Sequence, residues 1–165
     1  MKGVNDDEIL DFVRMTRKNR INVRFIEYMP FGSNGWSRAG YMPCGDILAA
    51  IMTQYSLLPM PQAGKHAVSR DFRIPLFRGS VSVISSMSEH FCDGCNRIRL
   101  TADGRSKSCL FSQAETDVRQ VLRSEGGDEE IADVFRDALA AKWYAHPPLH
   151  ALQYPMHRSM VQIGG

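Results

Sequence analysis

The sequence lacks the features that would place the chain in a membrane or send it out of the cell. No apolar run approaches the ~20 residues that a membrane-spanning helix needs. The opening MKGVNDDEIL has no apolar core of a secretory signal. The net charge is only +2, so the charge alone predicts no general attraction to nucleic acid or to a membrane surface. We therefore expect a soluble intracellular protein with neither nucleic acid nor membrane as a partner.

Cysteine is also scarce, because only four occur among 165 residues, which is too few for a disulfide framework. Internal repeats and low-complexity segments are absent, which argues against a repeat architecture. Apolar residues make up 44% of the chain and charged residues 23%, as in an ordinary globular protein. The length suits one compact domain, or one domain with part of another.

Three of the cysteines lie close together in the run CDGCNRIRLTADGRSKSC. Cys92 and Cys95 have the Cys-x-x-Cys spacing that directs two sulfurs to one point, and a hairpin could bring Cys109 beside them. Three thiolates leave one coordination position open to a substrate or to another ligand. Three interpretations stay open from spacing alone: a structural zinc with His90 or another residue as the fourth ligand, an iron-sulfur cluster with one exposed iron, and buried thiols without a metal.

The pattern of apolar and turn residues predicts an α/β protein. The acidic residues after Asn5 and the apolar residues behind them predict a helix that ends at residues 18–20, and residues 22–29 read as a buried strand that stops at Pro30. A helix followed by a buried strand is the repeating unit of a parallel α/β fold. Further predictions are helices near 45–55, 115–124 and 129–143, a linker at 59–67, strands at 72–77, 81–85, 96–101 and 106–111, and a hairpin turn at 102–104.

The residues around the cysteines closely resemble the GTP 3′,8-cyclase family of radical S-adenosylmethionine enzymes. The resemblance rests on SMSEHFCDGCNRIRLTADGRSKSCLF, on RFIEYMP upstream and on RSMVQIGG at the end, and it extends across the whole chain. It implies a role in molybdenum cofactor biosynthesis, in which GTP becomes (8S)-3′,8-cyclo-7,8-dihydroguanosine 5′-triphosphate. It also implies a homodimer, handoff of the product to cyclic pyranopterin monophosphate synthase, and a location in the bacterial cytoplasm or the mitochondrial matrix.

The same resemblance assigns the cysteines to a [4Fe-4S] cluster whose fourth iron faces GTP. The matching ligands here are Cys92, Cys95 and Cys109. A zinc module that contacts nucleic acid is a weaker alternative, because the charge is near neutral and no aromatic residues alternate with the basic ones.

The stretch behind the first two cysteines supplies the nucleotide ligands that the resemblance implies, Arg97 and Arg99 with Ile98 between them. If these residues form a strand, positions 97 and 99 point to one face, where two guanidinium groups could meet a triphosphate. A solvated strand face is the alternative. Arg105 and Lys107 lie beyond the turn, and we expect them to be exposed to solvent.

In RFIEYMP, the resemblance directs Arg24 toward GTP and Met29 toward S-adenosylmethionine. The end of a strand in a parallel α/β barrel is where ligands normally bind. The alternatives are that Met29 belongs to the core and that Glu27 pairs with Arg24 or another neighbour.

The sequence ends with Gly164 and Gly165, for which two interpretations exist. A frayed tail is the default for terminal residues. Glycine also lets a backbone enter a narrow pocket without a side-chain clash, and the resemblance implies that this pair reaches the active site and is needed for catalysis. A ubiquitin-like tail is rejected, because nothing upstream reads as a small β-grasp domain.

One family motif is missing, since no CxxxCxxC occurs in the sequence. In the family this motif holds a second [4Fe-4S] cluster at which S-adenosylmethionine is cleaved. The expected fold is therefore a C-terminal remnant of a partial parallel (β/α) TIM-like barrel, residues 1–42, followed by a smaller α+β iron-sulfur cluster domain that binds GTP, residues 43–165. Two hypotheses follow: the chain is the substrate-binding half of the cyclase, or it is a non-catalytic module that binds an iron-sulfur cluster and GTP.

Overall fold

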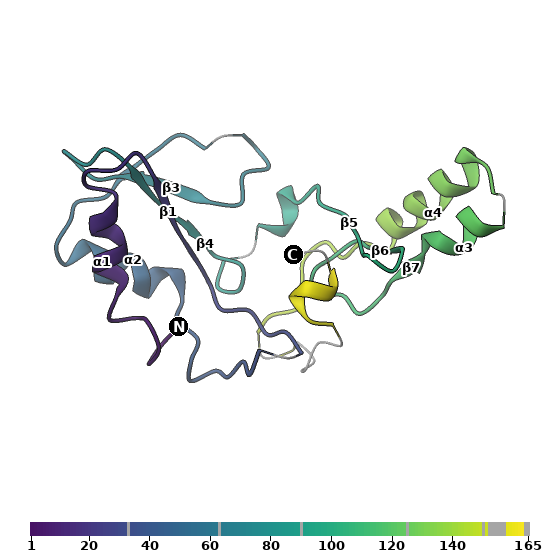
Figure 1. Ribbon diagram of the computed structural model, residues 1–165, viewed down its shortest axis with the longest axis horizontal. Helices are drawn as coiled ribbons and strands as arrows, with labels where there is room; N and C mark the ends of the chain where they lie inside the picture. Colours follow the sequence, from purple (N-terminus) through teal and green to yellow (C-terminus); the bar gives the residue numbers. More distant parts are fainter. Residues whose placement is uncertain are drawn as a thin grey trace. The chain divides into compact units, whose positions relative to one another are not determined.

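The computed structural model of the chain describes residues 1–32, 34–62, 64–89, 91–124, 126–149, 151 and 158–163. These residues form two compact units (Figure 1). The first unit comprises Met1–Met29 and Trp36–Cys95, and the second comprises Pro30–Gly35 and the chain from Asn96 onward. Each unit contains its own sheet, so the predicted mixed α/β class is confirmed. The predicted domain boundary between residues 42 and 43 stays a prediction.

The first sheet has four strands in the order β1-β4-β3-β2. Its central pair, β1 (Asn22–Ile26) and β4 (Ser80–Ile84), is parallel, whereas β3 (Arg70–Arg73) and β2 (Leu58–Pro59) are added antiparallel. A parallel pair requires a crossover connection, and helix α2 (Cys44–Met52) lies within it. The predicted linker at 59–67 begins at the last residue of β2, which is a short edge strand.

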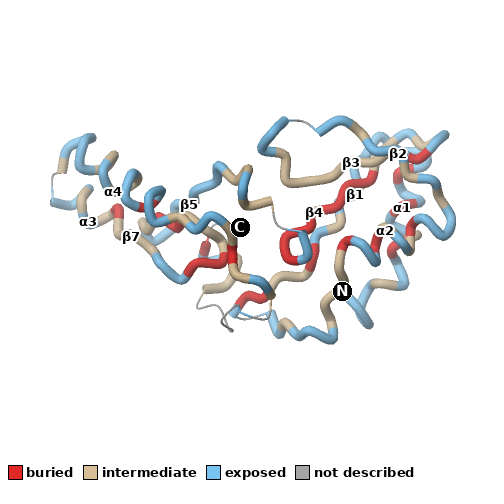
Figure 2. The backbone as a smooth tube through the Cα atoms, turned by 180° about the vertical axis from the view of Figure 1, so that it is seen from behind, coloured by how far each residue is buried: buried red, intermediate tan, exposed pale blue. Residues whose placement is uncertain are grey.

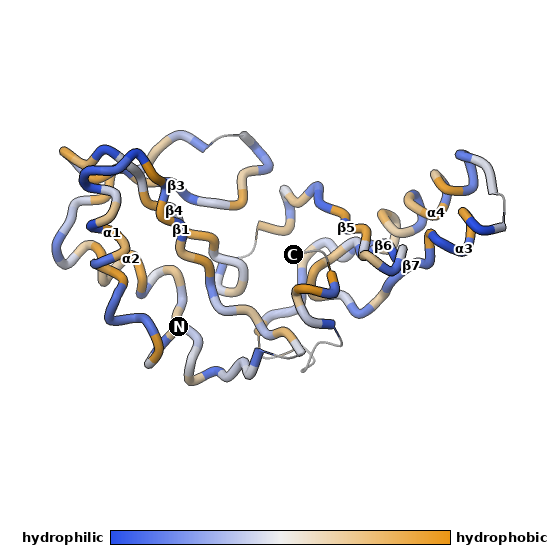
Figure 3. Tube along the Cα trace, in the orientation of Figure 1, coloured by the Kyte–Doolittle hydropathy of each residue, from blue (hydrophilic) through white to orange (hydrophobic). Residues whose placement is uncertain are grey.

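Helices α1 (Ile9–Met15) and α2 contact each other and β1, and they enclose the apolar core of the first unit. Figure 2 shows the buried residues along β4, and Figure 3 shows apolar residues along β1 and β4. The helix α1 begins later than predicted, because the Asp6 carboxylate accepts a hydrogen bond from the Gly3 amide at 2.6 Å and forms a turn there. The buried core residues are Ile9, Val13, Ile47, Ile51, Ile74 and Val81.

A glycine fixes the entry into β4. The Gly79 amide donates to the Thr16 carbonyl at 2.9 Å. A side chain at position 79 would collide with the Ile21 carbonyl oxygen, and a Cβ there would lie 2.7 Å from the Asn19 carbonyl oxygen. Glycine therefore lets the start of β4 approach the segment between α1 and β1 closely enough for the parallel pairing.

The second sheet has three antiparallel strands, β5 (Arg99–Leu100), β6 (Arg105–Lys107) and β7 (Thr116–Asp117). The predicted hairpin turn at 102–104 joins β5 to β6, with Arg99 opposite Lys107. Gly104 has a φ of +78°, and a Cβ there would lie 2.8 Å from the Arg119 Cβ. Both strands are shorter than predicted, because the chain turns into loops immediately before β5 and after β6.

Two helices follow the second sheet, as predicted, although both are shorter than expected. These are α3 (Val118–Arg123) and α4 (Asp128–Ala140). The carboxylate of Asp117 caps α3 by accepting the Gln120 amide at 3.0 Å. Figure 3 shows polar and apolar residues alternating along α4. None of the helices in the described ranges is long and apolar enough to cross a membrane.

Candidate functional site

The first two cysteines lie on one tight turn, as the spacing predicts. Cys92 opens the 3-10 turn η1 (Cys92–Gly94), and the Cys95 amide donates to the Cys92 carbonyl at 3.0 Å. Both residues are partly exposed. In contrast, burial raises the pKa of the fully buried Cys44 to about 11, which favours a protonated thiol.

A segment predicted as linker packs against this turn. The His66 Nδ1 lies 2.6 Å from the Gly94 carbonyl oxygen. A Cβ at Gly94 would lie 3.0 Å from the Lys65 carbonyl oxygen, so only a small residue lets the two segments approach this closely. A hollow of about 220 Å³ lies beside them, with Lys65, His66 and Asp93 in its wall. Sequence reasoning missed this support, because nothing in the local spacing links residue 66 to residue 94.

A buried carboxylate joins three segments of the first unit. Glu27 is 2% exposed and follows the end of β1. It accepts hydrogen bonds from the amides of Cys44 at 2.7 Å, Met87 at 2.6 Å and Ser88 at 2.8 Å, and from the Ser88 hydroxyl. Arg24 is not among these partners, and its Nε instead donates to the Asn22 side chain at 3.3 Å. Glu27 thus ties the start of α2 and the segment before the cysteine turn to the end of β1.

The charge of Glu27 affects the groups around it. Burial, followed by the nearby Glu27, raises the pKa of Tyr41 to about 12. The Cys44 amide that Glu27 binds is in the first turn of α2, where the helix dipole also favours a negative charge. Glu27 is the lone acid in an otherwise apolar run, and this pattern is the sequence signal that could have identified it. An isolated buried charge must find several hydrogen-bond donors.

One face of the first sheet carries several polar side chains beside the exposed Ile26. Residues of β1 alternate, so that Phe25 packs on the core while Arg24 is exposed on the opposite face. Ser82 of β4 lies in register with both Arg24 and Asp71, so these three side chains share that face. The Asp71 Oδ1 is buried and has no hydrogen-bond partner in the described part of the chain. Sequence reasoning missed Asp71, which only the strand register brings near Arg24.

Met29 lies beyond the end of β1 and is partly buried. It belongs to the first unit, as does Arg24. Both the predicted contact with S-adenosylmethionine and the alternative of a core residue stay predictions.

The two predicted nucleotide arginines differ in their backbone setting. Arg99 begins β5 and is partly buried, whereas Arg97 is exposed and precedes the strand. The strand alternation used to place both on one face therefore does not apply to Arg97. Ile98 between them is 37% exposed, and the Arg97 carbonyl accepts a hydrogen bond from Lys142 Nζ at 3.0 Å.

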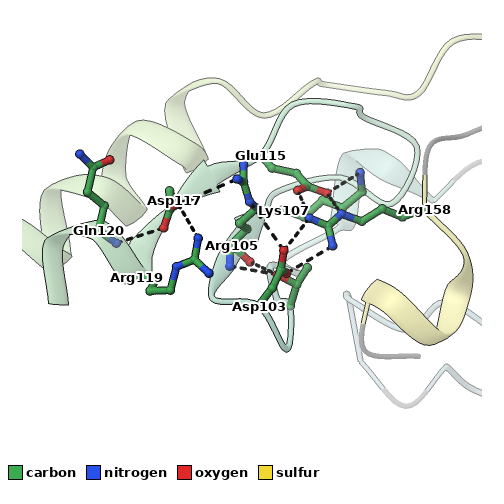
Figure 4. A network of polar contacts seen from close by, with 9 residues as sticks. Asp103, Arg105, Lys107, Glu115, Asp117, Arg119, Gln120 and Arg158 are labelled. Carbon is green, nitrogen blue, oxygen red and sulfur yellow. Dashed lines mark hydrogen bonds and ion pairs between the residues drawn. The ribbon is translucent and has the colours of Figure 1, made fainter. Parts of the chain in front are cut away.

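The prediction that Lys107 is exposed is wrong, because it is only 5% exposed. Its ammonium donates to the Ser112 carbonyl and lies 3.9 Å from the Glu115 Oε1 (Figure 4). The Ser112 amide in turn donates to the Cys109 carbonyl at 3.3 Å. Lys107 therefore closes the loop that contains the third cysteine. The side chain of the neighbouring Arg105 is 39% exposed, so the solvent exposure predicted for it is not contradicted.

The predicted site residues are divided between the two units. Cys92, Cys95, Arg24 and Met29 belong to the first unit, and Cys109, Arg97, Ile98 and Arg99 belong to the second. Gly164, Gly165 and His90 lie outside the described residues.

The donor chemistry of the cysteine site fits an iron-sulfur cluster. Thiolates that are not in disulfides are the donors that iron-sulfur clusters use, and the four cysteines form no disulfide within the described ranges. The turn at Cys92 and Cys95 presents two such donors on one short element. Across the described residues, no group of three or more His, Cys, Asp or Glu side chains is arranged to hold a metal ion. The three-cysteine ligand set therefore stays a prediction, supported by its donor chemistry and by the turn.

Comparison with known proteins covers nearly the whole chain. A model of the family described as Molybdenum Cofactor Synthesis C matches residues 21–147. The chain is 41% identical, over its whole length, to the mitochondrial GTP 3′,8-cyclase of Arabidopsis thaliana, of which it covers 42%. It is also 41% identical, over 99% of its length, to the GTP 3′,8-cyclase of Moorella thermoacetica, of which it covers 50%. Molybdenum cofactor biosynthesis protein 1 of Homo sapiens is 37% identical over 99% of the chain, which covers 26% of that protein. The chain thus spans half the length of these relatives or less.

Proposed function

This chain belongs to the Molybdenum Cofactor Synthesis C family, and we propose that it acts in molybdenum cofactor biosynthesis as the substrate-binding half of a GTP 3′,8-cyclase. The family match over most of the chain, together with the names of the relatives, carries this proposal. The reaction of the complete enzyme converts GTP to (8S)-3′,8-cyclo-7,8-dihydroguanosine 5′-triphosphate. The product would pass to cyclic pyranopterin monophosphate synthase.

The three cysteines are the proposed ligands of a [4Fe-4S] cluster. When bound, the cluster supplies an open iron position at which GTP can be held. The chain's own contribution is to orient the thiols: the turn supplies Cys92 and Cys95, and the loop closed by Lys107 supplies Cys109. Glu27 supports the turn, because its hydrogen bonds fix the backbone of the segment that leads to Cys92.

The arginines are proposed to bind the triphosphate. Arg97 is exposed, and Arg99 lies partly buried at the start of β5, so both offer guanidinium donors to an anion. Ile98 would contact the nucleotide between them. Arg24, on β1, would also orient GTP.

Residues 1–42 are proposed to be the last helix and strand of a partial parallel (β/α) barrel, and residues 43–165 the cluster domain. Within these residues, helix α1 is followed by β1, which pairs in parallel, and this helix–strand order supports a barrel origin. In such a barrel the face that carries Arg24 would look inward, and Met29 beyond the strand end would contact S-adenosylmethionine. Gly164 and Gly165 are proposed to reach into the active site, and the complete enzyme to be a homodimer.

The sequence contains no CxxxCxxC motif, which favours a second candidate function for this chain by itself. In that case it binds an iron-sulfur cluster and GTP, and the cleavage of S-adenosylmethionine at a second [4Fe-4S] cluster depends on residues supplied elsewhere. Incubation of this chain with S-adenosylmethionine and a reductant should then yield no 5′-deoxyadenosine. Detection of 5′-deoxyadenosine would reject this candidate.

The test of the proposed site is a GTP titration of anaerobically reconstituted protein. Arg97→Ala and Arg99→Ala should each weaken GTP binding by roughly 1.5 to 3 kcal/mol, the value of a charge-assisted hydrogen bond. Arg123→Ala removes an exposed arginine at the end of α3 and should leave the affinity unchanged. Equal affinity in all three variants would reject the arginine assignment.

Colourless protein with stoichiometric zinc, in place of iron-sulfur absorption, would reject the cluster.

A further inference from the structure

A network of charges joins the end of the described chain to the second sheet (Figure 4). The Arg158 guanidinium lies between two carboxylates. Its Nη2 donates to Asp103 Oδ2 at 2.9 Å and to Glu115 Oε2 at 2.8 Å, and its Nε lies 2.8 Å from Glu115 Oε1. Glu115 thus binds the guanidinium through both oxygens. Such paired contacts fix the orientation of the arginine as well as its position.

The network continues from Glu115 to the loop that contains the third cysteine. The Lys107 side chain is 6% exposed and the Glu115 side chain 11% exposed, so this ion pair is largely removed from solvent. Because Lys107 also donates to the Ser112 carbonyl, it holds both ends of the loop around Cys109. A buried charge that loses its partner is strongly destabilising, which makes Glu115 the link between the loop and Arg158.

A second anchor holds the same terminal segment. The short turn η2 (Met160–Ile163) follows Arg158, and Ile163 at its end is only 1% exposed. A cavity of about 110 Å³ is lined by Lys107, Glu115, Arg158 and Ile163, among others. Residues 158–163 are therefore held at one end by ion pairs and at the other by an apolar contact. Gly164 and Gly165 follow directly in the sequence.

We propose that Arg158 and Glu115 are positioning residues that couple the Cys109 loop to residues 158–163. Through this coupling, the third cysteine and the origin of the Gly164–Gly165 tail keep a fixed relation to each other. The consequence for catalysis rests on the proposed function, whereas the coupling is a property of the second unit alone.

The charges around position 158 favour an arginine there over a lysine. Lys107 and Arg158 balance Glu115 and Asp103, so the loss of any single one of these four leaves an unbalanced charge among them. Hydrogen bonds from Arg158 and from the Thr101 hydroxyl hold the pKa of Asp103 well below its usual range. A lysine in place of Arg158 keeps the charge but cannot donate to both carboxylates in one plane.

The coupling can be tested in the full chain without any metal. The first measurement is the alkylation rate of each thiol in the metal-free protein, and the second is amide hydrogen exchange in residues 107–115 and 159–163. In Arg158→Gln, we expect Cys109 to react about tenfold faster and exchange in both segments to rise about tenfold, as follows from loss of a charge-assisted hydrogen bond. Cys92 and Cys95, in the first unit, are internal references whose rates should not change.

Arg136→Gln is the matched control, because it removes an arginine that pairs with Glu129 and Asp133 on the exposed side of α4. It should alter neither measurement. Faster exchange in residues 159–163 with an unchanged Cys109 rate would overturn the coupling. If Arg158→Gln does not fold, Arg158→Lys replaces it: a smaller increase in both measurements supports the coupling, and no increase in either overturns it. Neither readout requires GTP or a cluster, so failure of the proposed function would leave both results interpretable.

Discussion

The two compact units arrange their buried side chains differently. The first unit contains a contiguous apolar cluster between its helices and its sheet. It also buries polar and charged residues, which are Thr16, Glu27, Ser82, Ser85 and Ser86. The second unit buries Phe111, Val118 and Ile163 together with Thr101, Ser106, Lys107, Ser112 and His146, and its buried Lys107 is in an ion pair. The hydrophobic effect depends little on pH, whereas ion pairs change as their carboxylates titrate. The first unit should therefore respond mainly to changes of packing, and the second to changes of charge.

The units also treat a buried charge differently. Glu27 in the first unit is surrounded by backbone amides and a hydroxyl, which are neutral donors. Lys107 in the second unit is balanced by the carboxylate of Glu115 as well as by a carbonyl. Both arrangements need an ionised carboxylate, but only the ion pair has a second partner that also carries a charge. The segment that leads to Cys92 therefore depends on hydrogen bonds from neutral donors to Glu27, whereas the loop around Cys109 depends on an ion pair.

The largest effect that would sharpen this comparison is expected in the apolar core. Ile51 is fully buried, so Ile51→Ala should lower the free energy of unfolding of the first unit by about 2 to 5 kcal/mol through lost burial and the cavity left behind. Denaturant titration, with hydrogen exchange reporting on each unit, measures the effect. Met52→Ala, at a 58% exposed neighbouring position, should cost much less. An equal loss of protection in the second unit would show that the two units do not unfold separately, and the comparison would fail.

A somewhat smaller effect is expected at the buried carboxylate. Glu27→Gln places an amide NH₂ against backbone N–H donors, so it should cost roughly 1.5 to 3 kcal/mol, the value of hydrogen bonds to a charged group. The Met87 and Ser88 amides should lose their protection in hydrogen exchange. Because Glu27 raises the pKa of Tyr41, that pKa should also fall in the variant.

The control for this change is Glu89→Gln, at an exposed glutamate that pairs with Arg70 at 2.9 Å. An exposed ion pair of this kind is worth about 0 to 1 kcal/mol. If the two glutamine variants lose equal stability, Glu27 does not hold the segment before the cysteine turn.

Sequence patterns predicted the elements that depend on neighbours in the chain. The Cys92–Cys95 turn and the hairpin at 102–104 were both predicted, because each is defined by a few adjacent residues. The burial of Lys107 was not predicted, since its partners Ser112 and Glu115 reach it only after the loop folds back. Its place beyond the hairpin turn had suggested a lysine exposed to solvent.

Residues that depend on long-range pairing escaped prediction for the same reason. Glu27 binds the backbone amide of Met87, which lies 60 positions further along the chain. Asp71 comes near Arg24 only through the register of two strands with β4. Arg97 was placed on a strand that in fact begins at Arg99, because alternation does not mark where strand pairing starts.

The smallest expected effect is the response of the second unit to acid. Arg158 and Thr101 hold the pKa of Asp103 below its usual value of about 3.9. A group whose folded pKa is depressed contributes stability above its unfolded pKa, and this contribution is lost as the pH falls through the folded pKa. Asp103 should therefore stay ionised at pH 4, and residues 159–163 should keep their protection there. Protection should be lost only at a lower pH.

Carboxyl-carbon NMR of Asp103 between pH 6 and the acid limit of the fold measures this midpoint. The groups that face Asp103 are Arg158, Thr101 and Arg105, whose Nε lies 3.7 Å from the carboxylate. Because the carboxylate is exposed, added salt should move the midpoint back toward the ordinary value. Arg158→Gln should do the same at low salt, whereas Arg136→Gln should not. An ordinary midpoint in the unmodified chain would mean that Arg158 does not bind Asp103 in solution, and the charge-dependent anchor of the second unit would lose one of its two carboxylates.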